Sequence, residues 1–346
     1  MKNFHLQFGG KITKELQAEY EQSENWKDGK FQNLEKTEMD ISLGKIPGVI
    51  YKQLTKEGQK PKASLPILPF DEKVFLAPAD KAKFIWYGHS VVLMRLNGKT
   101  ILIDPMLGSN TSPIAPFPTK RFSENSLSLI DSLPEIDLIL LTHDHYDHLD
   151  YDSIQKLKHK AKKYFVALGV KRHLVRWGVE ADLITEFDWW NDETFEDIHI
   201  TFTPTRHFSG RGLTDRAKCL WGGWVFKTDK ENIWFSGDGG YGEHFKPIGE
   251  RFGPFDFAFM ECGQYNDDWR PIHMFPDESV QAALDAQVKK AMPVHWAGFS
   301  LSYQHAWTDP ADEFVKFSKE KELEYMLPPL GKVFTYSDTI QEEWWQ

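Results

Sequence analysis

The chain contains 346 residues, of which 41% are hydrophobic and 27% charged, and its formal net charge is −10. A chain of this length and composition buries a full hydrophobic core, in one large domain or two. The acidic balance disfavours a nucleic-acid partner, because proteins that bind nucleic acids usually present a basic surface.

Cysteine content and hydropathy indicate the compartment. Cys219 and Cys262 are the only cysteines, which is too few for a disulfide framework and typical of a reducing environment. The first residues lack the apolar segment of a signal peptide, and no apolar run approaches the ~20 residues of a transmembrane helix. We therefore expect a cytoplasmic protein without a transmembrane segment, for which peripheral membrane contact and a homo-oligomer both stay open.

Residues 1–80 are polar and predict an N-terminal extension that packs on the main domain, which we place at residues 81–346. One short helix is expected in the extension, near residues 17–22. The simplest interpretation is an arm that wraps the domain. The alternative is a lid over the pocket or a dimer element.

The main domain begins with a strand-rich pattern and continues with alternating strands and helices. The Asn97-Gly98 pair lies between two apolar runs and predicts a β-hairpin. Strands are expected at residues 84–87, 91–96 and 100–103. Helical periodicity is expected at residues 151–162, 171–177, 277–289 and 310–321. Two sheets flanked by helices fit this order.

A dense group of polar residues follows the apolar run at residues 136–141. Six consecutive positions there hold three histidines and two aspartates, His143, Asp144, His145, Asp147 and His148. Their imidazole nitrogens and carboxylate oxygens suit zinc, iron or manganese. Alternation along an extended segment would direct His143, His145 and Asp147 the same way, with His148 turning towards the same cavity.

Three further residues follow short apolar runs at the expected ends of strands. They are His207, Asp238 and His295. Loops at strand ends are where α/β proteins commonly build their sites. Asp238 lies between two glycines and, judged alone, is equally consistent with an Asx turn. Four other histidines lack such a setting and are expected to be structural or exposed, namely His159, His173, His199 and His244.

Taken in order, the His/Asp run and the three later residues resemble the metallo-β-lactamase superfamily. Further strings, between Phe84 and about Trp307, resemble the branch that contains N-acyl-phosphatidylethanolamine-hydrolysing phospholipase D. They include Trp86-Tyr87-Gly88-His89-Ser90, Ile103-Asp104-Pro105, Leu220-Trp221-Gly222-Gly223-Trp224, Arg251-Phe252-Gly253-Pro254-Phe255-Asp256 and His295-Trp296. The resemblance implies an α+β fold, a four-layer αββα sandwich, for the hydrolase domain at residues 81–346.

The resemblance also implies a set of metal ligands. One metal would be held by His143, His145 and His207, a second by Asp147, His148 and His295, and Asp238 would bridge both. Asp104 would orient a ligand histidine from behind. Two divalent ions are expected, with zinc as the first expectation and iron or manganese as alternatives.

Residues on the substrate side depart from the branch pattern. His273 falls where the branch carries a substrate-side histidine, and Phe275 and Asp277 replace its usual Asp and Glu. Gln264 and Tyr265 lie in a stretch that is usually apolar. We expect His273 and Tyr265 to hold substrate or protonate the leaving group, and Gln264 to contact substrate.

The expected reaction is hydrolysis. Between two cations a bridging water loses its proton near neutral pH, and Asp147 and Asp238 would hold the resulting hydroxide. The resemblance implies a phosphodiesterase acting on a phospholipid of the N-acyl-phosphatidylethanolamine type. A lactonase or esterase for a small polar, phosphorylated substrate is the alternative, favoured by Glu261 and Gln264. A nuclease and a non-catalytic metal-binding protein are weaker alternatives.

Overall fold

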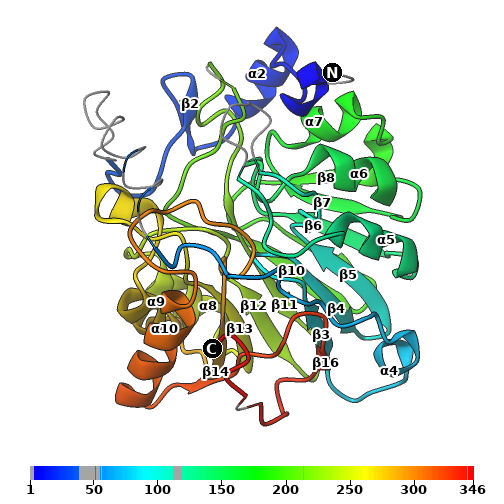
Figure 1. The fold of residues 1–346 in the computed structure, drawn as a ribbon. Coiled ribbons are helices and arrows are strands. Elements are labelled where there is room, and N and C mark those ends of the chain that lie inside the picture. Colours follow the sequence, from blue (N-terminus) through cyan, green and yellow to red (C-terminus); the bar gives the residue numbers. More distant parts are fainter. Residues whose placement is uncertain are drawn as a thin grey trace.

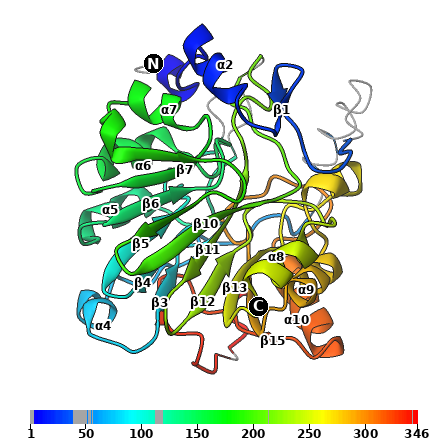
Figure 2. The same cartoon turned by 180° about the vertical axis from the view of Figure 1, so that it is seen from behind.

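The computed structural model describes residues 4–38, 51, 55, 57–111, 119–212, 214–340 and 342–346. Within that part of the chain, two seven-stranded sheets lie face to face (Figure 1). Helices cover the outer face of each sheet, as the reverse view in Figure 2 also shows. This four-layer α+β arrangement confirms the predicted αββα sandwich.

The first sheet is antiparallel at one end and parallel at the other. In sheet order its strands are β16 (Val333–Phe334), β3 (Lys83–Trp86), β4 (Val92–Leu96), β5 (Lys99–Ile103), β6 (Leu138–Leu141), β7 (Tyr164–Ala167) and β8 (Ile184–Phe187). Its outer face is covered by α5 (Leu129–Ser132), α6 (Tyr151–Leu157) and α7 (Lys171–Arg176), with 3₁₀ turns η2 (Ser126–Ser128) and η3 (Ala181–Leu183). The parallel strands therefore all point their carboxyl ends to one edge.

The second sheet repeats this mixed pattern. In sheet order its strands are β15 (Glu324–Tyr325), β14 (Lys290–Val294), β13 (Phe257–Glu261), β12 (Asn232–Phe235), β11 (Gly222–Lys227), β10 (Ile198–Pro204) and β9 (Asp192–Phe195). Its outer face is covered by α8 (Phe245–Phe252), α9 (Pro276–Asp285) and α10 (Asp309–Glu320), and η4 (Asp267–Ile272) precedes α9.

The predicted hairpin is confirmed, whereas two predicted helices end early. Asn97 and Gly98 both have positive φ, as a two-residue hairpin turn requires, and β4 pairs with β5 across them. The helix expected at 151–162 ends at Leu157, because Ala161 pairs with Ile136 beside the sheet. The helix expected at 277–289 ends at Asp285, because the next residues turn back towards β14.

The described part of the N-terminal extension lies against the main domain. It contains α1 (Phe4–Gln7), α2 (Lys14–Tyr20), the hairpin of β1 (Trp26–Lys27) and β2 (Lys30–Phe31), and α4 (Glu72–Leu76). The short helix expected near residues 17–22 is present as α2, but α1 and α4 are two further short helices that were not expected. The side chains of Thr13 and Asp71 cap α2 and α4. Residues 1–3, 39–50, 52–54 and 56 of the predicted extension lie outside the described residues.

Hydrogen bonds join this extension to distant parts of the chain. Leu6 O accepts from Trp177 Nε1 at 2.6 Å, and the Phe31 amide donates to Ala217 O at 2.9 Å.

In the described residues, no helix combines the length and the apolar character needed to cross a membrane.

Aromatic side chains fill the space between the two sheets. Phe84 on β3 is fully buried, and its ring lies 5.4 and 5.3 Å from the rings of Phe257 and Phe259 on β13. Contacts of this kind across the layer fix the spacing of the sheets and, with it, the strand ends that carry the site.

Phe84→Ala should lower the free energy of unfolding by about 3–5 kcal/mol, because it removes a buried ring and leaves a cavity between the sheets. The measurement is denaturant-induced unfolding, with Val74→Ala as control, since Val74 is 48% exposed. A loss below about 1 kcal/mol for Phe84→Ala would contradict this account of the core.

Candidate metal centre

The seven predicted ligands lie at strand ends of both sheets. The loop of His143, His145, Asp147 and His148 follows β6, and His207, Asp238 and His295 follow β10, β12 and β14. The structure brings all of them together in overlapping groups of potential metal donors. All except the half-buried His145 are buried.

A tight turn that begins at His145 presents Asp147 and His148, whereas His143 lies before the turn. The amides of His148 and Leu149 both donate to His145 O, at 3.1 and 2.8 Å. The expected alternation therefore fits His143 and His145, which share a donor group, but not Asp147, which lies in the turn. Asp147 and His148 share a second group, and His143 also lies within reach of His148 and Asp238.

Three imidazoles form a first group of donors. His145 Nδ1 lies 2.9 Å from His143 Nε2 and 3.2 Å from His207 Nε2. Ring nitrogens this close, from separate loops, converge on one point. A three-histidine set of this kind is a common way to hold a divalent cation with a coordination position left open.

A second group lies beside the first and shares a carboxylate with it. Asp238 Oδ2 lies 2.9 Å from both His148 Nε2 and His295 Nε2, and 4.0 Å from His207 Nε2. Asp147 Oδ2 lies 3.4 Å from His295 Nε2. Asp238 thus stands between the two groups, where a bridging ligand belongs.

Hydrogen bonds to Nδ1, on the side away from the cluster, fix the orientation of the His148 and His207 rings. Asp104 Oδ2 lies 2.8 Å from His148 Nδ1, and its carboxylate also accepts from the amide and hydroxyl of Thr142. Ile272 O accepts from His207 Nδ1 at 3.0 Å. Both rings therefore turn Nε2 into the cluster, as the outer partners of metal ligands usually ensure.

The electrostatics of the cluster fit a bound cation. Burial, reinforced by the neighbouring His148, lowers the pKa of His143 well below its ordinary value, which leaves the ring neutral and able to ligate. Burial opposes charge on His148, but Asp238, Asp147 and Asp104 outweigh it and raise the pKa of His148 to about 10. These carboxylates favour positive charge at this position, which a bound cation would supply in place of the ring proton.

Carboxylates held ionised beside imidazoles suit divalent metals. Burial raises the pKa of Asp238, yet His148 and His295 hold it well below its ordinary value. The donor set consists of imidazole nitrogens and carboxylate oxygens without a thiolate, as zinc, iron and manganese accept. The residues present therefore fit a metal centre.

Two residues of the cluster were not assigned from the sequence. His89 is buried, its Nε2 lies 2.9 Å from Asp147 Oδ2, and its ring lies 4.2 Å from that of His295. It follows β3 by a few residues, so the strand-end argument used for His207 would have found it.

Glu261 is the second unassigned residue, and the expectation that it faces substrate is wrong. It is fully buried at the end of β13. Its Oε1 lies 3.1 Å from His273 Nδ1 and 3.3 Å from His295 Nδ1, and its Oε2 accepts from the Met274 amide. Glu261 therefore orients two histidines of the cluster.

Of the predicted substrate-side residues, His273 alone lies at the cluster. Its ring stacks on that of His295 at 5.1 Å, and its side chain is 13% exposed. Gln264 is buried, and its amide bonds to the backbone of residues 295, 299, 301 and 302. The assignment of Gln264 to substrate is therefore corrected to a role in holding its own loop.

Tyr265 also points elsewhere. It is 4% exposed, and its ring packs between Phe275 and His305 at 4.8 and 4.2 Å. Its hydroxyl pairs with Glu313 on α10. The assignment of Tyr265 to substrate is corrected accordingly to packing beneath α10.

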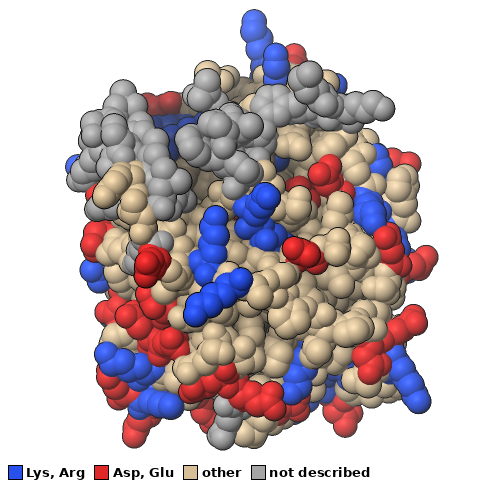
Figure 3. Space-filling view, viewed as in Figure 1, with Lys and Arg blue, Asp and Glu red and all other residues tan. Residues whose placement is uncertain are grey.

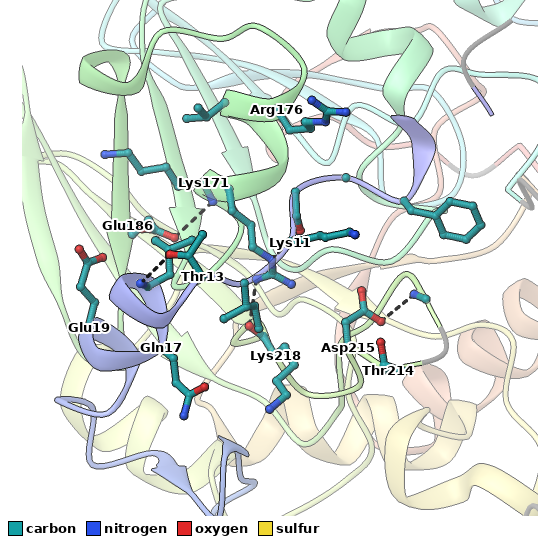
Figure 4. Close-up of a pocket in the computed structure, with 18 of the residues that line it drawn as sticks. Lys11, Thr13, Gln17, Glu19, Lys171, Arg176, Glu186, Thr214, Asp215 and Lys218 are labelled. Atoms are coloured by element: carbon teal, nitrogen blue, oxygen red, sulfur yellow. Dashed lines mark hydrogen bonds between the residues drawn. The ribbon is translucent and has the colours of Figure 1, made fainter. Parts of the chain in front are cut away.

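A separate cavity of about 1440 Å³ lies between α7 and the residues around α2 (Figure 4). Its lining mixes bases such as Lys11, Lys171 and Lys218 with the acids Glu19 and Glu186. None of the candidate ligands lines it. The cavity is therefore distinct from the metal centre.

His145→Ala and Asp238→Asn should each remove at least one metal ion per chain, because each deletes a donor on which others converge. The measurement is elemental analysis of the purified variants. His199→Ala, an exposed position, serves as control and should keep the full metal content. Normal metal content in either cluster variant would contradict the ligand assignment.

Known proteins share both the sequence and the fold. The family model for the beta-lactamase superfamily domain matches residues 99–296. An uncharacterised protein of Mycobacterium tuberculosis is 32% identical over 96% of this chain and 90% of its own length. An N-acyl-phosphatidylethanolamine-hydrolysing phospholipase D of Caenorhabditis elegans is 30% identical over 73% of this chain and 75% of its own length.

The solved structure of a metallo hydrolase from the archaeon Ignicoccus hospitalis matches the fold with a TM-score of 0.59. It is 20% identical, over 75% of this chain and 100% of that one. The chain thus belongs to the metallo-β-lactamase superfamily of metal-dependent hydrolases, in the branch that contains the N-acyl-phosphatidylethanolamine-hydrolysing phospholipases D.

Proposed function

We propose that the protein is a dinuclear metal-dependent phosphodiesterase that cleaves a phospholipid of the N-acyl-phosphatidylethanolamine type. The observation that carries the proposal is the place of Asp238, whose Oδ2 lies between two groups of imidazole donors. The similarity to the worm phospholipase D, at 30% identity, supports the substrate class.

Two bound cations would supply Lewis-acid activation of water and would neutralise charge on a phosphoryl oxygen. The chain's own residues orient the attacking water relative to the substrate, and they transfer protons. Asp147 and Asp238 are held ionised by neighbouring imidazoles, so their oxygens accept hydrogen bonds from the attacking water. Both carboxylates also fix that water with respect to the substrate.

His273 is the residue best placed to exchange a proton with the leaving group. When Nδ1–H donates to Glu261, the protonated ring carries its second proton on Nε2, from which the leaving oxygen can take it. The His207 and His295 rings each lie 5.1 Å from its ring, so the leaving oxygen of a bound diester comes within its reach. Its partial exposure suits a group at the mouth of the site.

The charges around the site favour an anionic substrate. The guanidinium of the exposed Arg216 lies 4.3 Å over the Phe208 ring, which itself lies 4.5 Å from the His145 ring. On the face drawn in Figure 3, Lys and Arg side chains gather near the centre, although the net charge of the chain is −10. Near the cluster, the guanidinium of Arg216 offers a positive charge that suits a phosphate.

The alternative of a lactonase or esterase for a small polar substrate has lost its specific support. It rested on Glu261 and Gln264 facing the pocket, and both side chains bond within the protein. The phosphodiester is therefore preferred.

The purified protein should hydrolyse a chromogenic phosphodiester, and should release N-acylethanolamine and phosphatidate from vesicles containing N-acyl-phosphatidylethanolamine. A chelator should abolish both activities and added metal should restore them, because the donor groups lose their cations. Chelator-sensitive hydrolysis of lactones or carboxyl esters without diester hydrolysis would contradict the phosphodiesterase.

His273→Ala should lower kcat about a hundredfold while the metal content stays unchanged, because a general acid contributes on that scale without binding metal. The measurement pairs steady-state kinetics with elemental analysis. His159→Ala is a control outside the cluster. Loss of metal from His273→Ala would instead make His273 a ligand.

A further inference from the structure

Asn33, in the N-terminal extension, holds the backbone of the candidate ligand His207. Asn33 Nδ2 donates to His207 O at 2.8 Å, and the His207 amide donates to Asn33 Oδ1 at 3.0 Å. Trp221 Nε1 donates to the same Oδ1 at 3.0 Å. These partners determine which end of the amide is oxygen, since two N–H groups face Oδ1 and a carbonyl faces Nδ2.

His207 needs such support because it lies beyond the sheet. β10 ends at Pro204, so no strand partner binds the peptide groups of His207. In the described residues, the amide of His207 donates to Asn33 and its carbonyl accepts from Asn33. Ile272 O holds Nδ1 of the ring. Backbone and ring are thus fixed from two sides, which leaves Nε2 aimed at the cluster.

The residues next to Asn33 reinforce the same contact. We call residues 33–37 the strap. Arg206 donates from Nη2 to Lys36 O at 2.9 Å and from Nε to Thr37 Oγ1 at 3.1 Å. Glu35 Oε1 accepts from the Glu243 amide at 3.1 Å. The strap therefore joins the loop of His207 to the loop that follows Asp238.

We propose that Asn33 is a positioning residue of the metal centre, which gives the strap a role in metal binding. Asn33 touches neither substrate nor metal, and it acts through His207. The inference rests on the proposed function, because it concerns the same metals. It differs from a lid or a dimer element, the roles considered for the extension, since it requires neither movement nor a second copy.

The test compares Asn33→Ala and Asn33→Asp with the full-length wild-type protein. Asn33→Asp is nearly isosteric and keeps both bonds to Oδ1, but it sets a carboxylate oxygen against His207 O. Gln32→Ala is the matched control, because the Gln32 side chain donates to Lys27 O within the extension. Metal retention is measured by dialysis against graded chelator, and the ligand field by the visible spectrum of Co²⁺-loaded protein.

Both Asn33 variants should retain one metal ion about tenfold to a hundredfold more weakly, as is usual when an outer partner of a ligand is lost. The Co²⁺ bands of that site should shift, the second site should keep its metal, and Gln32→Ala should match wild type. Unchanged retention and spectrum in Asn33→Asp would overturn the inference, even with a lowered melting temperature. A wild-type protein that takes up no metal would overturn the proposed function as well.

Discussion

The contact between Asp238 Oδ2 and the imidazoles of His148 and His295, each at 2.9 Å, is the constraint on which the structure depends. Carboxylates and imidazoles gathered away from water are unfavourable unless they are paired or bind a cation. Loops that moved freely would relax this crowding. The donors therefore have to be held by stiff elements, and each of them lies on a loop that follows a strand.

The ends of β11 and β12 show how closely the backbone must approach to provide this. A Cβ atom on Gly223 would meet the backbone of Phe235 and Ser236, and one on Gly237 would meet the backbone of Gly222. Gly237 also has a φ of +70°, which favours glycine. These glycines let the chain turn directly beneath Asp238. The carboxylate is consequently aimed by main-chain geometry, with little freedom left to the side chain.

The order of strands and helices, and the apolar runs that end near His or Asp, are short-range signals that predicted two sheets with candidate ligands at strand ends. The four-layer architecture and the division of the seven ligands between two metals came from the family resemblance. The local sequence had clear limits. It did not predict the roles of Glu261 and Gln264. Glu261 ends β13 and Gln264 follows it, and whether such a side chain faces substrate or protein depends on partners in other loops, such as His273 and Phe299. The sequence around Asn33 does not indicate its role, since its partner His207 lies 174 residues further along the chain. The predicted ends of two helices were wrong for a similar reason, because pairing of the following residues beside the sheets overrode the helical periodicity.

The long separation between Asn33 and His207 also bears on the order of assembly during synthesis. The strap leaves the ribosome early and has no loop to bind until residues 205–208 follow, and His295 comes later still. Contacts so distant in sequence form late in folding, because the loops that they close are long. Metal uptake is thereby coupled to a nearly complete chain, because a chain that stops before residue 205 lacks His207, Asp238 and His295.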